Sequence, residues 1–253
     1  MSSQSHSHHM TDLRVTSAMK RYTNWTLIII GAVLALLALS SRAWIPVVQP
    51  YWVEEETVDD FACASYVTSE DCEALRGIHA QNPEYAEAQL QAMAPENTFE
   101  VIDLEPSEIA TRMRQTIGSS DDPDIITIRN GVFNPPRNPI HNATGEVRII
   151  QIVASGQEAV ETFVRLDGGT DESFQVTNGP NLHVYLSQHP DPTTPEEVMS
   201  GDRGPLDLGP LRGNSGRQNY ELSLDIDPSL YGSLVIYCPE FDQIYGVAPF
   251  IEQ

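Results

Sequence analysis

LYGSLVIYCPEFDQIYGVA, residues 230–248, is an apolar run that carries one isolated cysteine, Cys238, directly before a proline. Three similar segments precede it: GVFNPPRNPIHNATGEVRI (131–149), GPNLHVYLS (179–187) and GNSGRQNYEL (213–222). In each segment Gly, Pro and Asn bound short apolar stretches, which is typical of β-strands joined by turns. These four segments therefore decide the fold class.

Apolar residues around these segments recur at every second position. The alternating pairs are Ile126 and Ile128, Val147 and Ile149, and Leu222 and Leu224. Turn signals stand between the runs, and residues 118–124 (GSSDDPD) read as a linker. A period of two without long helical patterns predicts a mainly β domain over residues 125–253, built as an antiparallel β-sandwich or an open barrel.

The four segments together resemble the DM-thirteen domain, the electron-transfer DM domain family, over about residues 125–250. The resemblance implies a role in electron transfer, through a bare thiol or a bound group such as haem. It makes Cys238, in LVIYC, the candidate redox residue and a candidate cofactor ligand. It also implies cofactor-binding roles for His141, in PIHNATGEV, and for His183, in GPNLHVYLS. The chain contains no C-x-x-C-H, so covalent c-type haem is excluded.

The chemistry of Cys238 stays open at this level. A thiolate is favoured by nearby positive charge or a helix N-terminus, whereas Cys238 lies in a strand of a strongly acidic domain. We expect a protonated thiol unless an arginine such as Arg165 or Arg217 lies close. The alternatives are a small buried hydrophobe, a ligand of a prosthetic group and a redox-active thiol. For His141 the alternative to a site role is a loop histidine bound to the backbone.

Tyr22 to Ser41 is a run of 20 uncharged residues. A helix of that length reaches about 30 Å, enough to cross the hydrocarbon core of a bilayer. Basic residues precede the run and acidic residues follow it, which predicts a signal-anchor helix over 22–43, a disordered cytoplasmic tail over 1–21 and an extracytoplasmic remainder. The alternative is a secretory signal cleaved near Ser41-Arg42-Ala43.

The sequence predicts an acidic stalk and a helical preface over residues 44–124. Asn82 can cap a helix that has Pro83 at its first position, and this helix should end before Pro95. A second helix is expected over 106–117, with Ile109, Met113 and Ile117 forming one apolar stripe against a core. The three histidines near the N-terminus fall in the predicted disordered tail.

The three cysteines of the chain leave one unpaired. In an oxidising compartment a disulfide between Cys63 and Cys72 is the favoured pairing, and it leaves Cys238 as a lone thiol. Pairing of Cys238 with either of the other two would require the preface to fold back on the sheet.

The net charge of the chain limits the classes of partner that it can bind. The formal net charge is −22, and beyond Ala43 there are 10 arginines and no lysine against 35 carboxylates. Such a surface repels phosphate, so nucleic acid is excluded as a partner. The acidity serves solubility or, alternatively, the capture of cations or of a basic electron-transfer partner.

The sequence thus favours a single-pass, membrane-anchored, extracytoplasmic accessory redox module centred on Cys238. It carries none of the common hydrolase, phosphate-loop or metal motifs, so a stand-alone enzyme is not expected. Its partners would be the membrane and a redox or envelope protein. The alternative is a non-enzymatic cell-envelope module that binds a protein or a glycan and in which the cysteine is structural.

Overall fold

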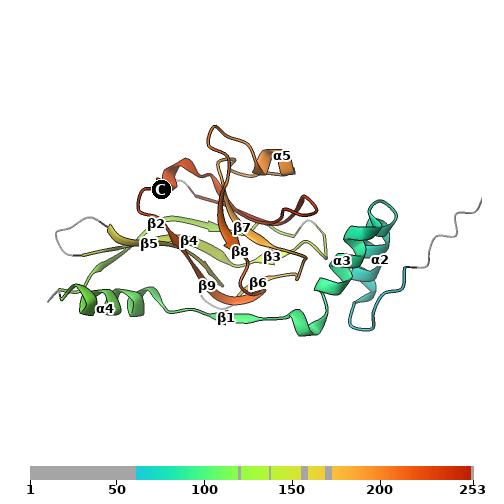
Figure 1. Ribbon diagram of the computed structural model, residues 1–253, viewed down its shortest axis with the longest axis horizontal. Helices are drawn as coiled ribbons and strands as arrows, with labels where there is room; N and C mark the ends of the chain where they lie inside the picture. The colour runs from blue at the N-terminus through green and yellow to red at the C-terminus, as the bar shows by residue number, and fades with distance from the viewer. Residues whose placement is uncertain (1–60, 119–120, 137, 155–158, 169–172, 252–253) are drawn as a thin grey trace, which may run out of the picture. The chain divides into compact units, whose positions relative to one another are not determined.

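The computed structural model describes residues 61–118, 121–136, 138–154, 159–168 and 173–251, and residues from Phe61 onward form one compact unit (Figure 1). The predicted tail over 1–21, the predicted anchor over 22–43 and the acidic run after it lie outside these residues. Within the described ranges, no helix is both long and apolar enough to cross a membrane.

Two helices, α2 (Ser69–His79) and α3 (Pro83–Ala92), pack side by side as a hairpin (Figure 1). α3 begins where the sequence predicted, because the Asn82 side chain accepts the N–H of Tyr85 at 3.0 Å. α2 was not predicted. Thr68 caps it by accepting the N–H of Asp71 at 3.1 Å.

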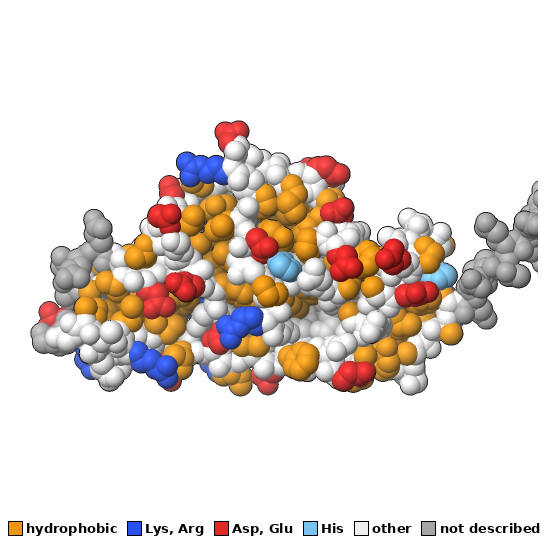
Figure 2. Space-filling view, viewed as in Figure 1, with side chains coloured by type: hydrophobic (Ala, Val, Ile, Leu, Met, Phe, Trp, Pro, Cys, Tyr) orange, Lys and Arg blue, Asp and Glu red, His pale blue; other side chains and the backbone are white. Residues whose placement is uncertain are grey.

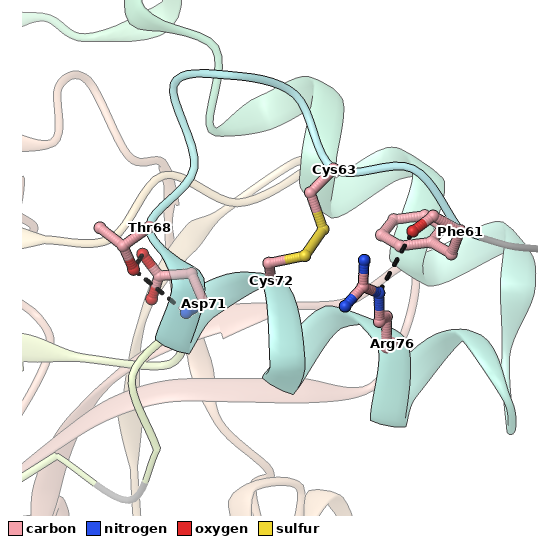
Figure 3. Close-up of a disulfide and its surroundings, with 6 residues drawn as sticks. All are labelled: Phe61, Cys63, Thr68, Asp71, Cys72 and Arg76. Carbon is pink, nitrogen blue, oxygen red and sulfur yellow. Dashed lines mark hydrogen bonds between the residues drawn. A yellow bond between two sulfur atoms is a disulfide. The ribbon is translucent and has the colours of Figure 1, made fainter.

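A disulfide joins Cys63 to Cys72, with an S–S distance of 2.06 Å and a Cα–Cα distance of 5.8 Å. Figure 3 shows that it ties the segment before α2 to the second turn of that helix. Arg76, one turn further along, donates to the carbonyl of Phe61 at 3.4 Å. This is the pairing that the sequence favoured, and it leaves Cys238 as the free cysteine.

The second predicted helix is α4 (Pro106–Ile117), which follows the short 3₁₀-helix η1 (Pro95–Asn97) and strand β1 (Glu100–Ile102). Glu105 and Glu108 form a capping box at its start, and Gly118 ends it in the left-handed conformation with φ of 71°. Ile109 and Met113 pack against the outer face of the large sheet. The predicted apolar stripe is wrong at Ile117, which is 46% exposed because it lies in the last turn of the helix.

Two sheets make up the β-domain, and every pairing in them is antiparallel except β1 with β9. The large sheet has the order β2-β4-β5-β9-β6-β3, with β1 beside β9, and the small sheet has the order β11-β10-β7-β8. The large sheet contains β2 (Asp124–Val132), β3 (Ala143–Thr144), β4 (Glu146–Val153), β5 (Ala159–Asp167), β6 (Phe174–Val176) and β9 (Ser215–Leu222). The small sheet contains β7 (His183–Ser187), β8 (Leu206–Pro210), β10 (Ser233–Cys238) and β11 (Gln243–Pro249). The short helices α5 (Pro195–Val198) and η2 (Pro228–Leu230) lie in the connections.

The inner faces of the two sheets share one hydrophobic core. Along one side the sheets also meet through the backbone, because Gly131 of β2 bridges to Phe250 and the N–H of Asn134 donates to Val247 at 2.8 Å. A Cβ on Gly131 would stand 2.4 Å from the carbonyl oxygen of Pro249, so this approach requires glycine. The domain is therefore mainly β and antiparallel, as predicted, with its two sheets joined along that side.

The predicted alternation fails at two strand ends. The register of β2 shifts between Thr127 and Arg129, so that Ile128 packs on the core while Ile126 is 44% exposed. Leu224 lies beyond the end of β9 and is 56% exposed.

Figure 2 shows red carboxylates spread over the face in view and few blue side chains, as the acidic composition requires.

Candidate functional site

Cys238 is the last residue of β10 and is fully buried. It pairs in register with Gln243 of β11. Leu234, Ile236 and Cys238 face the core between the sheets, whereas Val235 and Tyr237 pack on the opposite face. The alternation expected from the sequence therefore holds through this strand.

The thiol of Cys238 is held in its protonated form. Burial raises its pKa, and the nearby carboxylates of Glu240 and Asp242 raise it further, although the backbone N–H groups of Phe241 and Glu240 act in the opposite direction. The arginines named as stabilisers of a thiolate are engaged elsewhere. Arg165 binds Asp167 at 2.8 Å and also Glu105, and Arg217 binds Glu105 as well.

His141 is also buried, with 8% of its surface exposed. Asn138 fixes its tautomer. The Oδ1 of Asn138 accepts the backbone N–H groups of Ile140 at 3.1 Å and His141 at 2.7 Å, so its Nδ2 donates to His141 Nδ1 at 3.0 Å. Because Nδ1 accepts, the ring proton of the neutral imidazole sits on Nε2 and is donated to the hydroxyl of Tyr85. Burial lowers the pKa of His141 to about 4, which keeps the ring neutral.

A directed series of hydrogen bonds continues from Tyr85 of α3. The hydroxyl of Tyr85 lies 3.0 Å from that of Tyr245 on β11, which in turn donates to Oε1 of Gln89. Nε2 of Gln89 donates to the carbonyl of Asn178 at 2.8 Å. Since Tyr85 receives the proton of His141 and Tyr245 gives its own to Gln89, Tyr85 donates to Tyr245. All four buried side chains of this latch, Tyr85, Gln89, His141 and Tyr245, are thereby satisfied.

The latch joins α3 to the β-domain near the cysteine. The ring of Tyr85 packs on Phe241, 5.0 Å between centroids, and the backbone N–H of Phe241 acts to lower the pKa of Cys238. Burial raises the pKa of Tyr85 and of Tyr245, and proximity to Cys238 contributes to both shifts. Gly179 lies against the Tyr245 ring so closely that a Cβ there would stand 2.3 Å from it.

The sequence did not single out Tyr85 and Gln89. The segment PEYAEAQLQA was interpreted as a packing helix, and that interpretation is correct as far as it goes. The available signal was their spacing, because residues four apart share one face of a helix. Their partners lie at least 56 positions away, and no local pattern points to them.

His183 does not join this cluster. It is the register partner of Tyr237, so it lies on the face of the small sheet opposite to Cys238. Its Nδ1 lies 3.0 Å from the carboxylate of Asp207, and its ring stacks on Tyr185 at 6.1 Å between centroids. His183 therefore lies apart from Cys238 and His141, and its implied cofactor-binding role stays a prediction.

Cys238 and His141 do not fit an axially ligated haem. Both ring nitrogens of His141 are occupied by Asn138 and Tyr85, and the sulfur of Cys238 is sealed in the core. Iron ligation needs a free imidazole nitrogen or an accessible thiolate. Within the described part of the chain, no three His, Cys, Asp or Glu side chains gather as a metal site would require.

Comparison with known proteins gave a match to one family model. Neither a search of curated proteins nor a search of solved structures returned a significant match. One family model, described as Electron transfer DM13, matches residues 137–250, which contain His141, Tyr245 and Cys238. Residues 137–250 are therefore similar to the DM13 family, the family that the four sequence segments resemble.

Proposed function

We propose that the protein is a membrane-anchored, extracytoplasmic accessory redox module in which Cys238 is the group that is oxidised and reduced. The DM13 match over residues 137–250 is the observation that carries the redox class. Cys238 is the free cysteine of the chain, and the residues around it come from both the DM13 region and α3.

The proposed compartment rests on two features. The apolar run from Tyr22 to Ser41 has the length of a membrane-spanning helix. The Cys63–Cys72 disulfide belongs to an oxidising environment, where such bonds form and persist.

In the latched state the thiol is protonated and fully buried, and Tyr85 of α3 packs on the nearby Phe241, so the thiol cannot exchange electrons efficiently with a partner. Redox activity therefore requires α3 to move away from the domain. That movement breaks the hydrogen bonds of the latch, which is why a docking partner is needed to favour it.

Cys238 loses and then regains one electron and one proton in each redox cycle. With α3 displaced, the thiol releases its proton to solvent and one electron to the ferric haem of a partner protein, which becomes ferrous. The sulfur-centred radical then takes one electron from a one-electron donor protein and one proton from solvent, which restores the thiol. The module carries one electron per cycle, and a basic partner would suit its charge of −22.

A stopped-flow assay tests this. The full chain in detergent is mixed with a basic ferric cytochrome c, and its reduction is followed by absorbance. We expect up to one ferrous haem per chain, a rate that falls with salt, and no reduction by Cys238→Ser. Reduction by Cys238→Ser at the wild-type rate would overturn the proposal.

Cys238→Ser also distinguishes the redox proposal from the alternative function, a binding module with a structural cysteine. In that case Cys238→Ser would lower the free energy of unfolding by about 1 kcal/mol, as core changes commonly do, and the wild type would reduce no haem.

A further inference from the structure

A cavity of about 400 Å³ opens between β3, β6 and β9. Every side chain that lines it is uncharged, and all but Val176 are hydroxyl or amide residues. In a chain of net charge −22, a cavity of this size without a carboxylate is unusual.

The floor of this cavity is a row of three residues in register. Thr144 of β3 pairs with Gln175 of β6, and Gln175 pairs with Ser215 of β9. Their strand neighbours Ala143 and Val176 belong to the core, so the row faces outward. The sheet thus holds three polar side chains at fixed spacing on one surface.

Most of the polar side chains of this cavity are not used by the protein, the exceptions being Asn214 and Thr98, which accept from Phe99 and Asn178. Within the described residues, the side chains of Thr144, Gln175, Thr177 and Ser215 make no hydrogen bond, and Oδ1 of Asn142 is buried with no partner. A buried acceptor without a partner costs free energy, which a donor from a ligand would recover.

A second cavity, of about 300 Å³, adjoins the first through the shared residue Asn214. Phe99 lines it and is 58% exposed, and the side chains of Asn97 and Asn181 add further amides. Its arginine, Arg212, is already paired with Asp103 at 2.5 Å. The two cavities together offer neutral hydrogen-bonding groups beside one exposed aromatic ring.

The side chains that line the two cavities favour one chemical class of ligand. An ionised ligand would lose hydration, and the cation in the lining, Arg212, is already paired with Asp103. A ligand with many hydroxyls fits, because each hydroxyl both donates and accepts, and so do the amides and hydroxyls of the cavity. The exposed ring of Phe99 provides an apolar surface for the C–H face of a sugar ring.

We infer that this double cavity, the amide groove, binds an uncharged saccharide of two or three units. The row Thr144–Gln175–Ser215 and Oδ1 of Asn142 bind the hydroxyls of one unit, and Phe99 stacks on the next. None of the four latch side chains lines the groove, although Asn178, whose carbonyl accepts from Gln89, does. The inference does not rest on the redox proposal.

Isothermal titration calorimetry on the full chain tests the groove. The detergent is zwitterionic and free of sugar headgroups, since a maltoside would occupy the site. The probes are maltotriose, cellotriose, mannotriose and chitotriose, with trigalacturonate as a charged comparison. We expect at least one neutral probe to bind with millimolar affinity or better, and trigalacturonate to bind more weakly.

Substitutions at two exposed residues of the amide groove test whether the saccharide binds there. Phe99→Ala and Gln175→Ala should each weaken binding about tenfold, while Leu224→Ala, an exposed residue outside the groove, leaves it unchanged. Thermal melting checks that the variants remain folded. No binding of any neutral probe up to about 10 mM, or equal binding by all three variants, would overturn the inference.

Discussion

His141 donates its Nε2–H to the hydroxyl of Tyr85, a residue 56 positions earlier in the chain. The direction of this bond follows from Asn138, which occupies Nδ1 with a donor. A histidine of the DM13 region is thus committed to a tyrosine that lies outside the matched residues.

Tyr85→Phe should lower the free energy of unfolding by about 1–3 kcal/mol, because it leaves the Nε2–H of His141 and the hydroxyl of Tyr245 without a partner. Urea denaturation followed by circular dichroism measures this. Tyr66→Phe is the matched control, since its hydroxyl bonds the carbonyl of Leu90 at an exposed position. Equal losses in the two variants would contradict the latch.

Stability should fall as the pH drops from about 6.5 to about 4. The folded protein lowers the pKa of His141 to about 4, whereas the unfolded chain has an ordinary value near 6.5, so the unfolded state binds more protons in this range. The stabilisation is complete above pH 6.5 and amounts to about 3 kcal/mol. Denaturation at pH 4.5 and 7.5 measures it.

His141→Gln should remove most of that pH dependence, while His79→Gln, which alters a ring packed at a tilt against Phe61, should retain it. Asp167 acts at lower pH. Although burial opposes it, Arg165 and Arg148 lower its pKa, so its contribution is lost only as the pH falls below the range of an ordinary aspartate. A pH profile unchanged by His141→Gln would contradict the prediction.

Opening of α3 should control the reactivity of Cys238. Gln89→Ala removes the bonds to Tyr245 and Asn178, so we expect maleimide to label Cys238 roughly 5–30 times faster. Mass spectrometry follows the reaction, and the disulfide keeps the other two cysteines silent. Gln91→Ala, on the exposed side of the same helix, is the control. Equal labelling of the two variants would show that α3 does not cover the thiol.

Removing the disulfide should destabilise the α2–α3 hairpin. Cys63→Ala with Cys72→Ala opens a loop of nine residues, which costs about 2.5–3 kcal/mol on the chain-entropy model. Hydrogen exchange should show the loss of protection in α2 first, with the sheets little changed. Uniform loss of protection throughout the domain would mean that the hairpin does not open separately.

Arg165→Met should lower the free energy of unfolding by about 3–5 kcal/mol, because it leaves the carboxylate of Asp167 short of its buried partner. Arg114→Met, which breaks an exposed pair with Asp122, should cost at most about 1 kcal/mol. Urea denaturation compares the two. A similar loss in both would show that the buried pair adds nothing beyond a surface one.

Short sequence patterns correctly predicted helix ends and the face of a strand residue, because neighbouring residues determine these features. The start of α3 follows from the cap at Asn82, the end of α4 from Gly118, and the inward face of Cys238 from alternation along β10. α2 was missed because its cap, Thr68, lies in a segment of mixed polarity without a clear period.

The candidate site was predicted only in part, because tertiary contacts assemble it. Cys238 and His141 came from the resemblance, but Tyr85 and Gln89 reach them from a distant helix. Alternation along β7 predicts the face of His183, but only the pairing with β10 shows that Cys238 lies on the other face.

The reach of α3 into the DM13 region also decides where the functional unit begins. A fragment cut at the first matched residue would lose α3, β1 and the edge strand β2, and it would expose the imidazole of His141, the phenol of Tyr245 and the sulfur of Cys238 to water. Expressed alone, such a fragment would show a reactive thiol that the intact protein conceals. The smallest unit that preserves the native chemistry of the cysteine therefore starts near Phe61.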